Sequence, residues 1–246
     1  MKTAGLGRAG WLAAGLLMAF LAVTAAPAVF GAPDVSKKAA SQLKLAQTYF
    51  DAGRLAEALG TVDKALAEES RYSQAHLLRG MILHALGKMD EALKEFDRTL
   101  SLDRKYTDAR IYRGSALANL KRYDEAMTEF RKAQEDLSYP WPERILVNIG
   151  MLHREQGRSD EAIENLRRAV ALNPSHAKGY YELGVTYEKQ GRDTDAVRAY
   201  QDALVGMDNS PDLHLKLGMA LKRVGNGAKA REHFERVTAL APDGPA

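Results

Sequence analysis

The sequence predicts an all-α fold, a solenoid of six stacked helix–turn–helix units. The first observation is an alanine that recurs every thirty-four residues, with one interval of thirty-six, at Ala58, Ala92, Ala126, Ala162, Ala196 and Ala230. The second is that a small residue stands twelve positions before each of these alanines, and a bulky apolar residue stands four positions after it. A fixed period of this length is typical of arrays in which each unit packs only on its neighbours.

The unit formed by residues 73–106 explains the pattern physically. Apolar residues fall at helical spacing on both sides of Gly87, which predicts two amphipathic helices joined at that glycine. Glycine ends a helix without steric cost because it tolerates the left-handed conformation. Asp90 is expected to cap the second helix. Gly80 leaves room for the two helices to approach closely, with Phe96 filling the space beside them.

The pattern resembles the tetratricopeptide repeat family. Six units fit, at residues 39–72, 73–106, 107–140 with a two-residue extension, 143–176, 177–210 and 211–244. The resemblance implies a right-handed superhelix with a protein-binding concave surface. Two departures stand out: Lys121 replaces the glycine of the turn in the third unit, and Arg79 and Arg113 replace the leucine that is common before the small residue. Their long stems are expected to pack while the guanidinium groups reach solvent or an acid.

Residues 1–31 are expected to be a secretory signal peptide, followed by a linker at residues 32–38. Lys2 and Arg8 give a positive start, and an uncharged apolar run over residues 11–26 precedes several small residues. Cleavage is expected near residue 28 or residue 31. The alternative is an uncleaved inner-membrane anchor, although the run is shorter than the roughly 20 residues that span a bilayer. Both interpretations place the repeats outside the cytoplasm, in the periplasm or cell envelope.

The chain contains no cysteine, which excludes disulfides and a lipid-modified cysteine. Loss of Lys2 and Arg8 with the signal peptide lowers the formal net charge from +3 to +1. A near-neutral chain of mixed charge disfavours nucleic acid as the main partner. We therefore expect protein partners, with a homo-oligomer as a further alternative.

One segment, Ser138–Glu143, interrupts the array and separates residues 39–142, which hold the first three units, from residues 143–246, which hold the last three. It has two prolines in three residues, which prevent a continuous helix. Tyr139 and Trp141 are either exposed contact residues for a partner or rings that fill an altered junction between units.

No set of residues in the sequence predicts catalysis. The histidines are scattered over different repeat positions, no HExxH motif occurs, and the glycines belong to the repeats rather than to a phosphate-binding loop. Acidic pairs recur at the starts of second helices, where they favour the positive helix terminus. We expect no enzyme activity, no metal site and no cofactor.

The resemblance also implies which residues face the concave groove, since the second, fifth, ninth and twelfth positions of each unit point into it. Charges at the second positions, Asp108, Arg144, Lys178 and Asp212, are expected to set the register of a partner. The fifth positions are Leu43, Leu77, Ile111, Val147, Tyr181 and Leu215. The ninth positions are Gln47, Met81, Ser115, Met151, Val185 and Met219, and Phe50 and His84 are twelfth positions of the first two units. This wall is expected to be unusually apolar.

Two interpretations of this wall remain open. In one, the groove receives an extended or helical partner segment on adaptable methionines. In the other, the same residues complete the packing between adjacent first helices. The lysine and asparagine pair that relatives use at the fifth and ninth positions to clamp a C-terminal carboxylate occurs in no unit.

The sequence as a whole predicts a non-enzymatic protein-binding scaffold of the bacterial periplasm or envelope. Its layout of signal peptide and repeats is similar to that of type IV pilus biogenesis proteins of the same repeat family. The alternative is an accessory or targeting subunit of an envelope enzyme complex.

Overall fold

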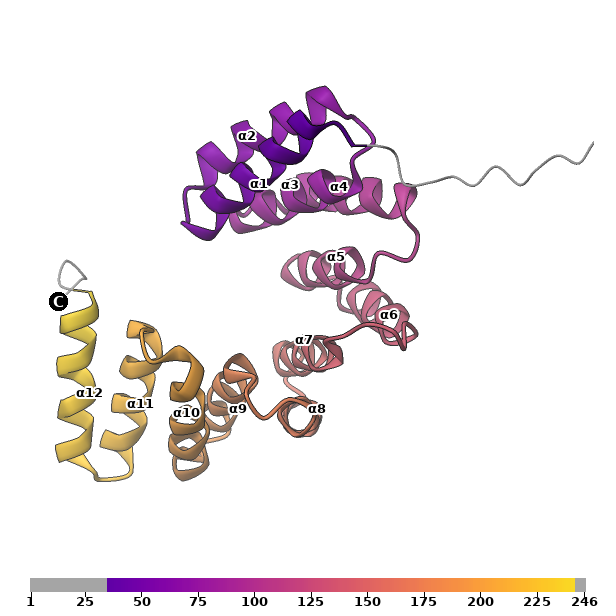
Figure 1. Ribbon diagram of the computed structural model, residues 1–246. Coiled ribbons are helices and arrows are strands. Elements are labelled where there is room, and N and C mark those ends of the chain that lie inside the picture. Colours follow the sequence, from indigo (N-terminus) through magenta and orange to yellow (C-terminus); the bar gives the residue numbers. More distant parts are fainter. Residues whose placement is uncertain (1–34, 242–246) are drawn as a thin grey trace, which may run out of the picture. The chain divides into compact units, whose positions relative to one another are not determined.

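The computed structural model describes residues 35–241, which belong to one compact unit (Figure 1). The predicted signal peptide at residues 1–31 and residues 32–34 of the predicted linker lie outside the described residues. Residues 35–241 form twelve α-helices and no strand, so the predicted all-α solenoid is confirmed. Ser36 caps the first helix through its side chain, which accepts a hydrogen bond from the Ala39 amide.

The helices come in consecutive pairs, and each pair has a first and a second helix. The first helices are α1 (Lys37–Asp51), α3 (Ser73–Ala85), α5 (Thr107–Asn119), α7 (Pro142–Glu155), α9 (Ala177–Lys189) and α11 (Pro211–Arg223). The second helices are α2 (Leu55–Glu68), α4 (Met89–Leu102), α6 (Tyr123–Gln134), α8 (Ser159–Leu172), α10 (Asp193–Met207) and α12 (Gly227–Leu240). We number the pairs as units one to six.

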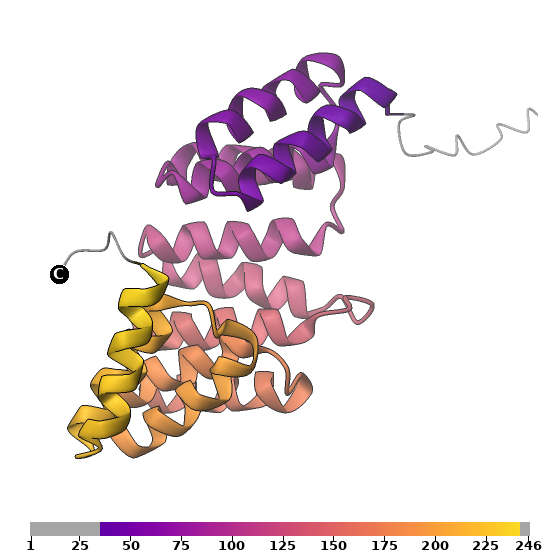
Figure 2. The same ribbon diagram turned by 60° about the vertical axis from the view of Figure 1, so that its left-hand side comes forward.

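Each helix packs mainly on its neighbours along the chain, and this makes the stack nearly one-dimensional (Figures 1 and 2). Beyond these neighbour contacts, first helices of consecutive units also touch, namely α1 with α3, α3 with α5, α5 with α7 and α7 with α9. No comparable contact joins second helices within residues 35–241. First helices therefore lie on the shorter, concave side of the stack, and second helices lie on its outer side.

The two helices of a pair meet where a small residue faces a large one. A methyl group placed on Gly80 would lie 2.5 Å from Cε1 of Phe96, so only glycine fits beside this ring. Glycine and an aromatic ring meet in the same way at Gly114 and Phe130, and at Gly184 and Tyr200. This contact confirms the close helix approach that the repeated small residue predicted.

The turns inside the pairs use the left-handed conformation. Five glycines have positive φ angles in the described chain: Gly53, Gly87, Gly157, Gly191 and Gly225. Lys121 has φ of 60°, and it is the one non-glycine residue of the described chain with this conformation. The expectation that Asp90 caps a second helix is wrong: α4 begins at Met89, so Asp90 lies within its first turn, where its charge favours the helix terminus.

The apolar core continues along the stack through the insertion at residues 138–143. One core cluster joins Phe96 and Phe130 to Ile145 and Leu152 of α7, so it crosses from unit three to unit four. The contact between α6 and α7 is nevertheless the least extensive between consecutive helices. Pro142 occupies the first turn of α7, as expected for a residue that starts a helix but cannot continue one.

Candidate functional site

The predicted fifth positions of the groove divide into buried and accessible residues. Leu77, Ile111 and Val147 are buried, since the next first helix of the stack covers each of them. Leu43 and Tyr181 are partly buried. Leu215, in the last unit, is 41% exposed because no further unit follows α12 in the described chain. In the middle of the stack these side chains therefore complete the packing between first helices.

The predicted ninth positions form an accessible row along the concave side. Gln47, Met81, Ser115, Met151 and Val185 are partly buried, and Met219 is 48% exposed. Phe50 and His84, at twelfth positions, are also partly buried. The row thus offers methionine side chains that a partner can reach, whereas most of the fifth-position wall is closed to it.

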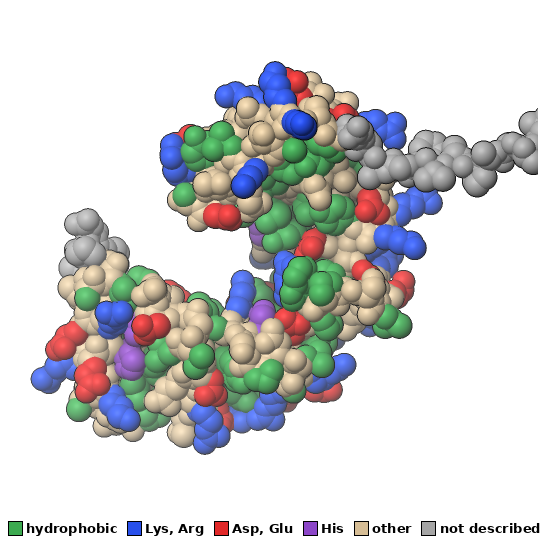
Figure 3. Space-filling view, in the orientation of Figure 1, with side chains coloured by type: hydrophobic (Ala, Val, Ile, Leu, Met, Phe, Trp, Pro, Cys, Tyr) green, Lys and Arg blue, Asp and Glu red, His purple; other side chains and the backbone are tan. Residues whose placement is uncertain are grey.

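Two adjoining cavities lie along the concave side between α3 and α9, and we call them together the concave groove. One measures about 200 Å³ and the other about 360 Å³, and both are lined by Ser115, Asn119, Asn148 and Met151. The larger cavity extends past Ile111 and Val147 to His176 and Lys178. In the space-filling view, hydrophobic, basic and histidine side chains mix on this side (Figure 3). The expected apolar wall is therefore polar at its centre.

Two asparagine side chains supply most of this polarity. The Asn148 side chain donates to the Arg144 carbonyl at 2.7 Å, and its oxygen lies 3.0 Å from the Ser115 hydroxyl. Asn119 donates to Nε2 of His84 at 3.0 Å, which ties unit three to unit two. Burial lowers the pKa of His84, so its ring is neutral near pH 7 and can accept this bond. Each amide keeps further donor or acceptor capacity that these bonds leave unused.

The charges of the groove are mainly positive. Arg144 is bound to Asp108 at 2.8 Å and to the Tyr139 hydroxyl at 2.7 Å. Lys178 is exposed, and no carboxylate lies within ion-pair distance of it in the part of the chain that the structure describes. His176 also lines the groove, and its pKa is lowered, first by burial. Glu155 is the single acidic side chain among the residues that line the two cavities.

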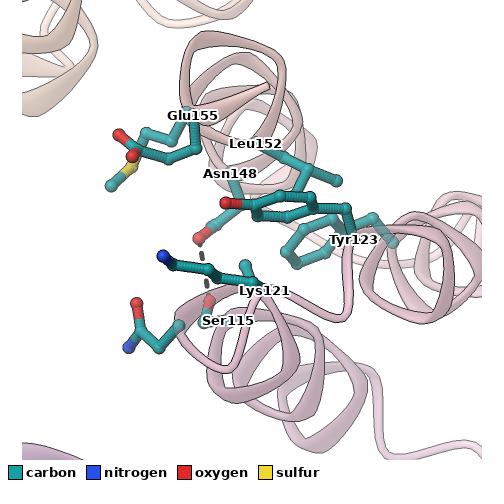
Figure 4. Close-up of a pocket in the computed structure, with 10 residues that line it drawn as sticks. Ser115, Lys121, Tyr123, Asn148, Leu152 and Glu155 are labelled. Atoms are coloured by element: carbon teal, nitrogen blue, oxygen red, sulfur yellow. Dashed lines mark hydrogen bonds between the residues drawn. The ribbon is translucent and has the colours of Figure 1, made fainter. Parts of the chain in front are cut away.

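Lys121 brings the strained turn of unit three into the groove. It lines the smaller cavity together with Tyr123 and Glu155. In Figure 4 the side chains of Lys121, Asn148 and Glu155 point into the same space, from the α5–α6 turn and from α7. A left-handed lysine costs roughly 1–2 kcal/mol relative to glycine, and such strain clusters at functional sites. The strained lysine is therefore part of the candidate site.

Sequence reasoning missed Asn119, Asn148 and Lys121 as groove residues. They stand at the thirteenth, sixth and fifteenth positions of their units, outside the positions that the family resemblance assigns to the groove. A signal was available for Lys121 alone, because the five other units have glycine at the fifteenth position. The thirteenth and sixth positions hold mostly charged residues in the other units, so nothing in the sequence set Asn119 and Asn148 apart.

The insertion places its two aromatic rings in different environments. Tyr139 is 8% exposed and donates a hydrogen bond to Asp108 at 2.8 Å, so it fills the junction between units three and four and offers no surface to a partner. Trp141 is 49% exposed, packs edge-on against Tyr139, and has the Arg144 guanidinium 6.0 Å from its ring centre. Trp141 is therefore the accessible ring of the insertion.

The described residues contain no group of three or more histidine or acidic side chains placed to hold a metal ion. None of the helices between residues 35 and 241 combines the length and the apolar character needed to cross a membrane. What the concave groove offers chemically is hydrogen bonding, positive charge and thioether contacts along a channel that crosses several units.

Comparison with known proteins agrees with the geometry. Sequence models described as tetratricopeptide repeat match residues 43–107 and 147–214, residues 107–175, and residues 211–236. A solved structure of PilW, described as a widely conserved type IV pilus biogenesis factor, is 25% identical with a TM-score of 0.70, covering 85% of this chain and 96% of PilW. The structure of PilF from Pseudomonas aeruginosa has a TM-score of 0.64 at 20% identity, covering 84% and 93% of the two chains, and shows the fold alone.

Among curated proteins, the cytochrome c-type biogenesis protein CycH of Bradyrhizobium diazoefficiens is 32% identical over 110 residues, which are 41% of this chain and 30% of CycH. Human tetratricopeptide repeat protein 7B is 28% identical over 108 residues, 44% of this chain and 13% of that protein. The matches thus span less than a third of these curated relatives. Together, the family models cover most of the described helices. The chain belongs to the tetratricopeptide repeat family.

Proposed function

We propose that this protein is a non-enzymatic scaffold that binds an extended segment of a partner protein in the concave groove. The observation that carries the proposal is the continuity of the groove past Asn119 and Asn148, beside the accessible Met151. Asparagine amides with spare capacity suit a peptide backbone, whose N–H and C=O groups recur about every 3.3 Å in an extended chain. Met151 adapts to the apolar side chains between them.

Positive charge gives the groove a preference among segments. Lys121 lines the smaller cavity and Lys178 lines the larger one, with Glu155 as the single acidic lining residue. A segment with a carboxylate at either end therefore gains attraction without displacing an existing ion pair. The strained backbone of Lys121 is then retained because its ammonium group contributes to the site.

The setting that we propose is the periplasm or cell envelope of a bacterium, in the assembly of an exported machine such as a type IV pilus. The sequence features of residues 1–31 and the likeness to PilW over nearly its whole length support this setting. The match to CycH supports a second candidate, the assembly of cytochrome c, over a shorter stretch. An accessory subunit of an envelope enzyme remains the alternative that rests on the sequence alone.

Site-specific photocrosslinking tests the proposal. A benzoylphenylalanine at position 151 reports on the groove, and the same residue at position 205 is the control, since Val205 is 89% exposed. In the native cells we expect position 151 to give a defined adduct that position 205 does not give. Asn119→Ala together with Asn148→Ala should abolish that adduct while helicity stays unchanged.

The identity of the adduct decides the pathway. Pilus assembly proteins would support the first setting, cytochrome c maturation proteins the second, and an envelope enzyme the alternative. Equal adducts at positions 151 and 205 would reject the groove as the binding surface.

A further inference from the structure

A second pocket lies on the outer side of the stack, between α6 and α8, with α7 as its floor. It measures about 490 Å³, and we call it the outer pocket. Its lining residues are Asp124, Met127, Thr128, Arg131 and Gln134 of α6, Ile149, His153 and Gln156 at α7, and Arg158, Asn165 and Arg168 at α8. It lies where the contact between α6 and α7 is least extensive, so the insertion before α7 leaves room for it.

The pocket occupies a junction that lacks an ion pair found at the two junctions before it. At the two preceding junctions an aspartate of the second helix pairs with an arginine of the next first helix, Asp63 with Arg79 and Asp97 with Arg113, both at 2.7 Å. The equivalent positions here hold Arg131 and Ile149. Arg131 stands at the place of the aspartate and Ile149 stands at the place of the arginine, so this ion pair cannot form here.

A second cation of the pocket also departs from the repeat pattern. In units one to three and in unit five, the cation just after the turn pairs with the acid three residues later, as Arg54 does with Glu57. In unit four Glu161 stands at the place of that acid, yet Arg158 instead donates to the side chain of Gln156. Within residues 35–241, neither Arg131, Arg158 nor Arg168 has a carboxylate at ion-pair distance.

His153 is a second, independent indication that the pocket is a binding site. Its Nδ1 atom is buried and has no hydrogen-bond partner among the described residues, although nearly all buried polar atoms of proteins have one. Burial lowers the pKa of His153, the charges of Arg158 and Arg131 lower it further, and Glu161 and Glu164 act in the opposite direction. The ring is thus neutral near pH 7 and can accept or donate one hydrogen bond.

We propose that the outer pocket binds an acidic segment of a protein partner, with Arg131, Arg158 and Arg168 as its carboxylate ligands. Guanidinium groups pair with carboxylates through two parallel hydrogen bonds, and unpaired ones lose no existing pair on binding. The pocket is large enough for several side chains, and Gln134, Asn165 and Thr128 add neutral hydrogen-bonding groups. Asp124, Glu161 and Glu164 border it and limit the positive area, which favours a short acidic peptide over a continuous polyanion such as nucleic acid. The site is separate from the concave groove.

Fluorescence anisotropy with a labelled hexaglutamate peptide tests this site on the chain from residue 32 onward. The test variant carries Arg131→Gln, Arg158→Gln and Arg168→Gln. The matched control carries Arg71→Gln, Arg198→Gln and Arg231→Gln, three exposed arginines that also lack ion pairs in the described chain, so both variants lose the same net charge. Because the test variant loses all three charge-assisted carboxylate ligands, we expect it to bind at least about tenfold more weakly. The control should change by less than about twofold.

Two additional measurements make the outcome decisive. The ring nitrogen resonances of His153 in a 15N-labelled chain should shift when hexaglutamate is added, and they should not shift in the test variant. Inorganic phosphate should compete only weakly, since it cannot engage all three arginines. Equal losses in both triple variants, no binding by the unchanged chain, or tighter binding of a dodecathymidylate through the same three arginines would each overturn the proposal.

Discussion

Gly80 and Phe96 share one volume: the space that a Cβ would take on Gly80 is occupied by the Phe96 ring, with Cε1 2.5 Å away. Both residues are buried, one in α3 and the other in α4. The same relationship recurs with different residues in unit one, where Ala46 and Val62 stand at the equivalent positions and are fully buried. Different pairs of side chains thus occupy the equivalent buried positions between the two helices of a unit, so the array tolerates more than one combination.

This relationship predicts a compensating pair of substitutions. Gly80→Ala alone should destabilise the array by about 1–3 kcal/mol through overpacking, and Phe96→Val alone by about 2–4 kcal/mol through a cavity. The double variant reproduces the pair of unit one, so its loss should be smaller than the sum of the two by roughly 1–2 kcal/mol. Urea denaturation of all four proteins measures this coupling. Strict additivity would contradict the shared-volume account.

Relief of the strained turn gives a second prediction. Lys121→Gly should raise stability by about 0.5–1 kcal/mol, since glycine accepts a φ of 60° and only part of the gain is lost to unfolded-state freedom. Lys121→Ala is the control because it removes the same charge but keeps the strain. Thermal denaturation should rank glycine above the natural lysine. A gain of equal size in both variants would assign the effect to charge instead.

A third prediction concerns a buried ion pair between units four and five. Arg154 and Glu182 are 2.6 Å apart, and their side chains are 10% and 6% exposed. Removing one partner leaves a buried charge, so Arg154→Met should cost about 3–5 kcal/mol. Arg154→Met combined with Glu182→Leu should be markedly less destabilised than Arg154→Met alone. If urea unfolding found the double variant weaker than the single one, the pair would be a net stabilising element rather than a mutually compensated one.

Histidine pairing in the last unit predicts the response to acid. The Nδ1 atoms of His214 and His233 are 2.9 Å apart. The equivalent positions of unit two hold His76 and Glu95, which form an ion pair when the histidine is protonated. Burial lowers the pKa of His233, and the nearby His214 lowers it further. Because the folded state disfavours the protonated ring, the associated stability is present above the ordinary pKa of about 6.5 and is lost as the pH falls below it. Burial lowers the pKa of His84 and His153 as well, so they act in the same direction.

His233→Glu should make the array more resistant to acid, since a carboxylate placed opposite His214 attracts a protonated imidazole. Glu95 faces His76 at the equivalent position of unit two, 2.7 Å away. His233→Gln is the matched control, because it removes the ring without adding charge. The midpoint of acid unfolding, followed by circular dichroism, should shift to lower pH for glutamate more than for glutamine. An unchanged midpoint in both would show that acid unfolding begins elsewhere.

The fold could be predicted from the sequence because its determinants are local and repeated. The glycines at the turns and the pairing of Gly80 with Phe96 follow from spacing alone, and the structure confirms both. Arg79 and Arg113 also behave as expected, since their guanidinium groups reach acids of neighbouring second helices. Asp90 was misplaced because the helix begins one residue before it. Helix boundaries depend on backbone geometry that the residue pattern does not fix.

The candidate site was harder to predict, since accessibility is a property of the stack rather than of a unit. Leu77 and Met81 both belong to the concave side by their positions, yet the neighbouring first helix covers Leu77 and leaves Met81 partly accessible. The outer pocket depends on Arg131 and Ile149 standing where the two preceding junctions hold an ion pair. That difference becomes informative only once the contacts of the other junctions are known.

Contacts restricted to adjacent helix pairs carry a mechanical consequence for whatever occupies the concave groove. Such a chain can lose structure from either end, one hairpin at a time, without disturbing distant hairpins. The groove runs from His84 of α3 to Lys178 of α9 and so touches four consecutive hairpins. A segment of that length, once bound, would suppress the separate unfolding of these four hairpins. Hydrogen exchange in α3, α5, α7 and α9 would then slow together, while α1 and α11 would keep their own exchange rates.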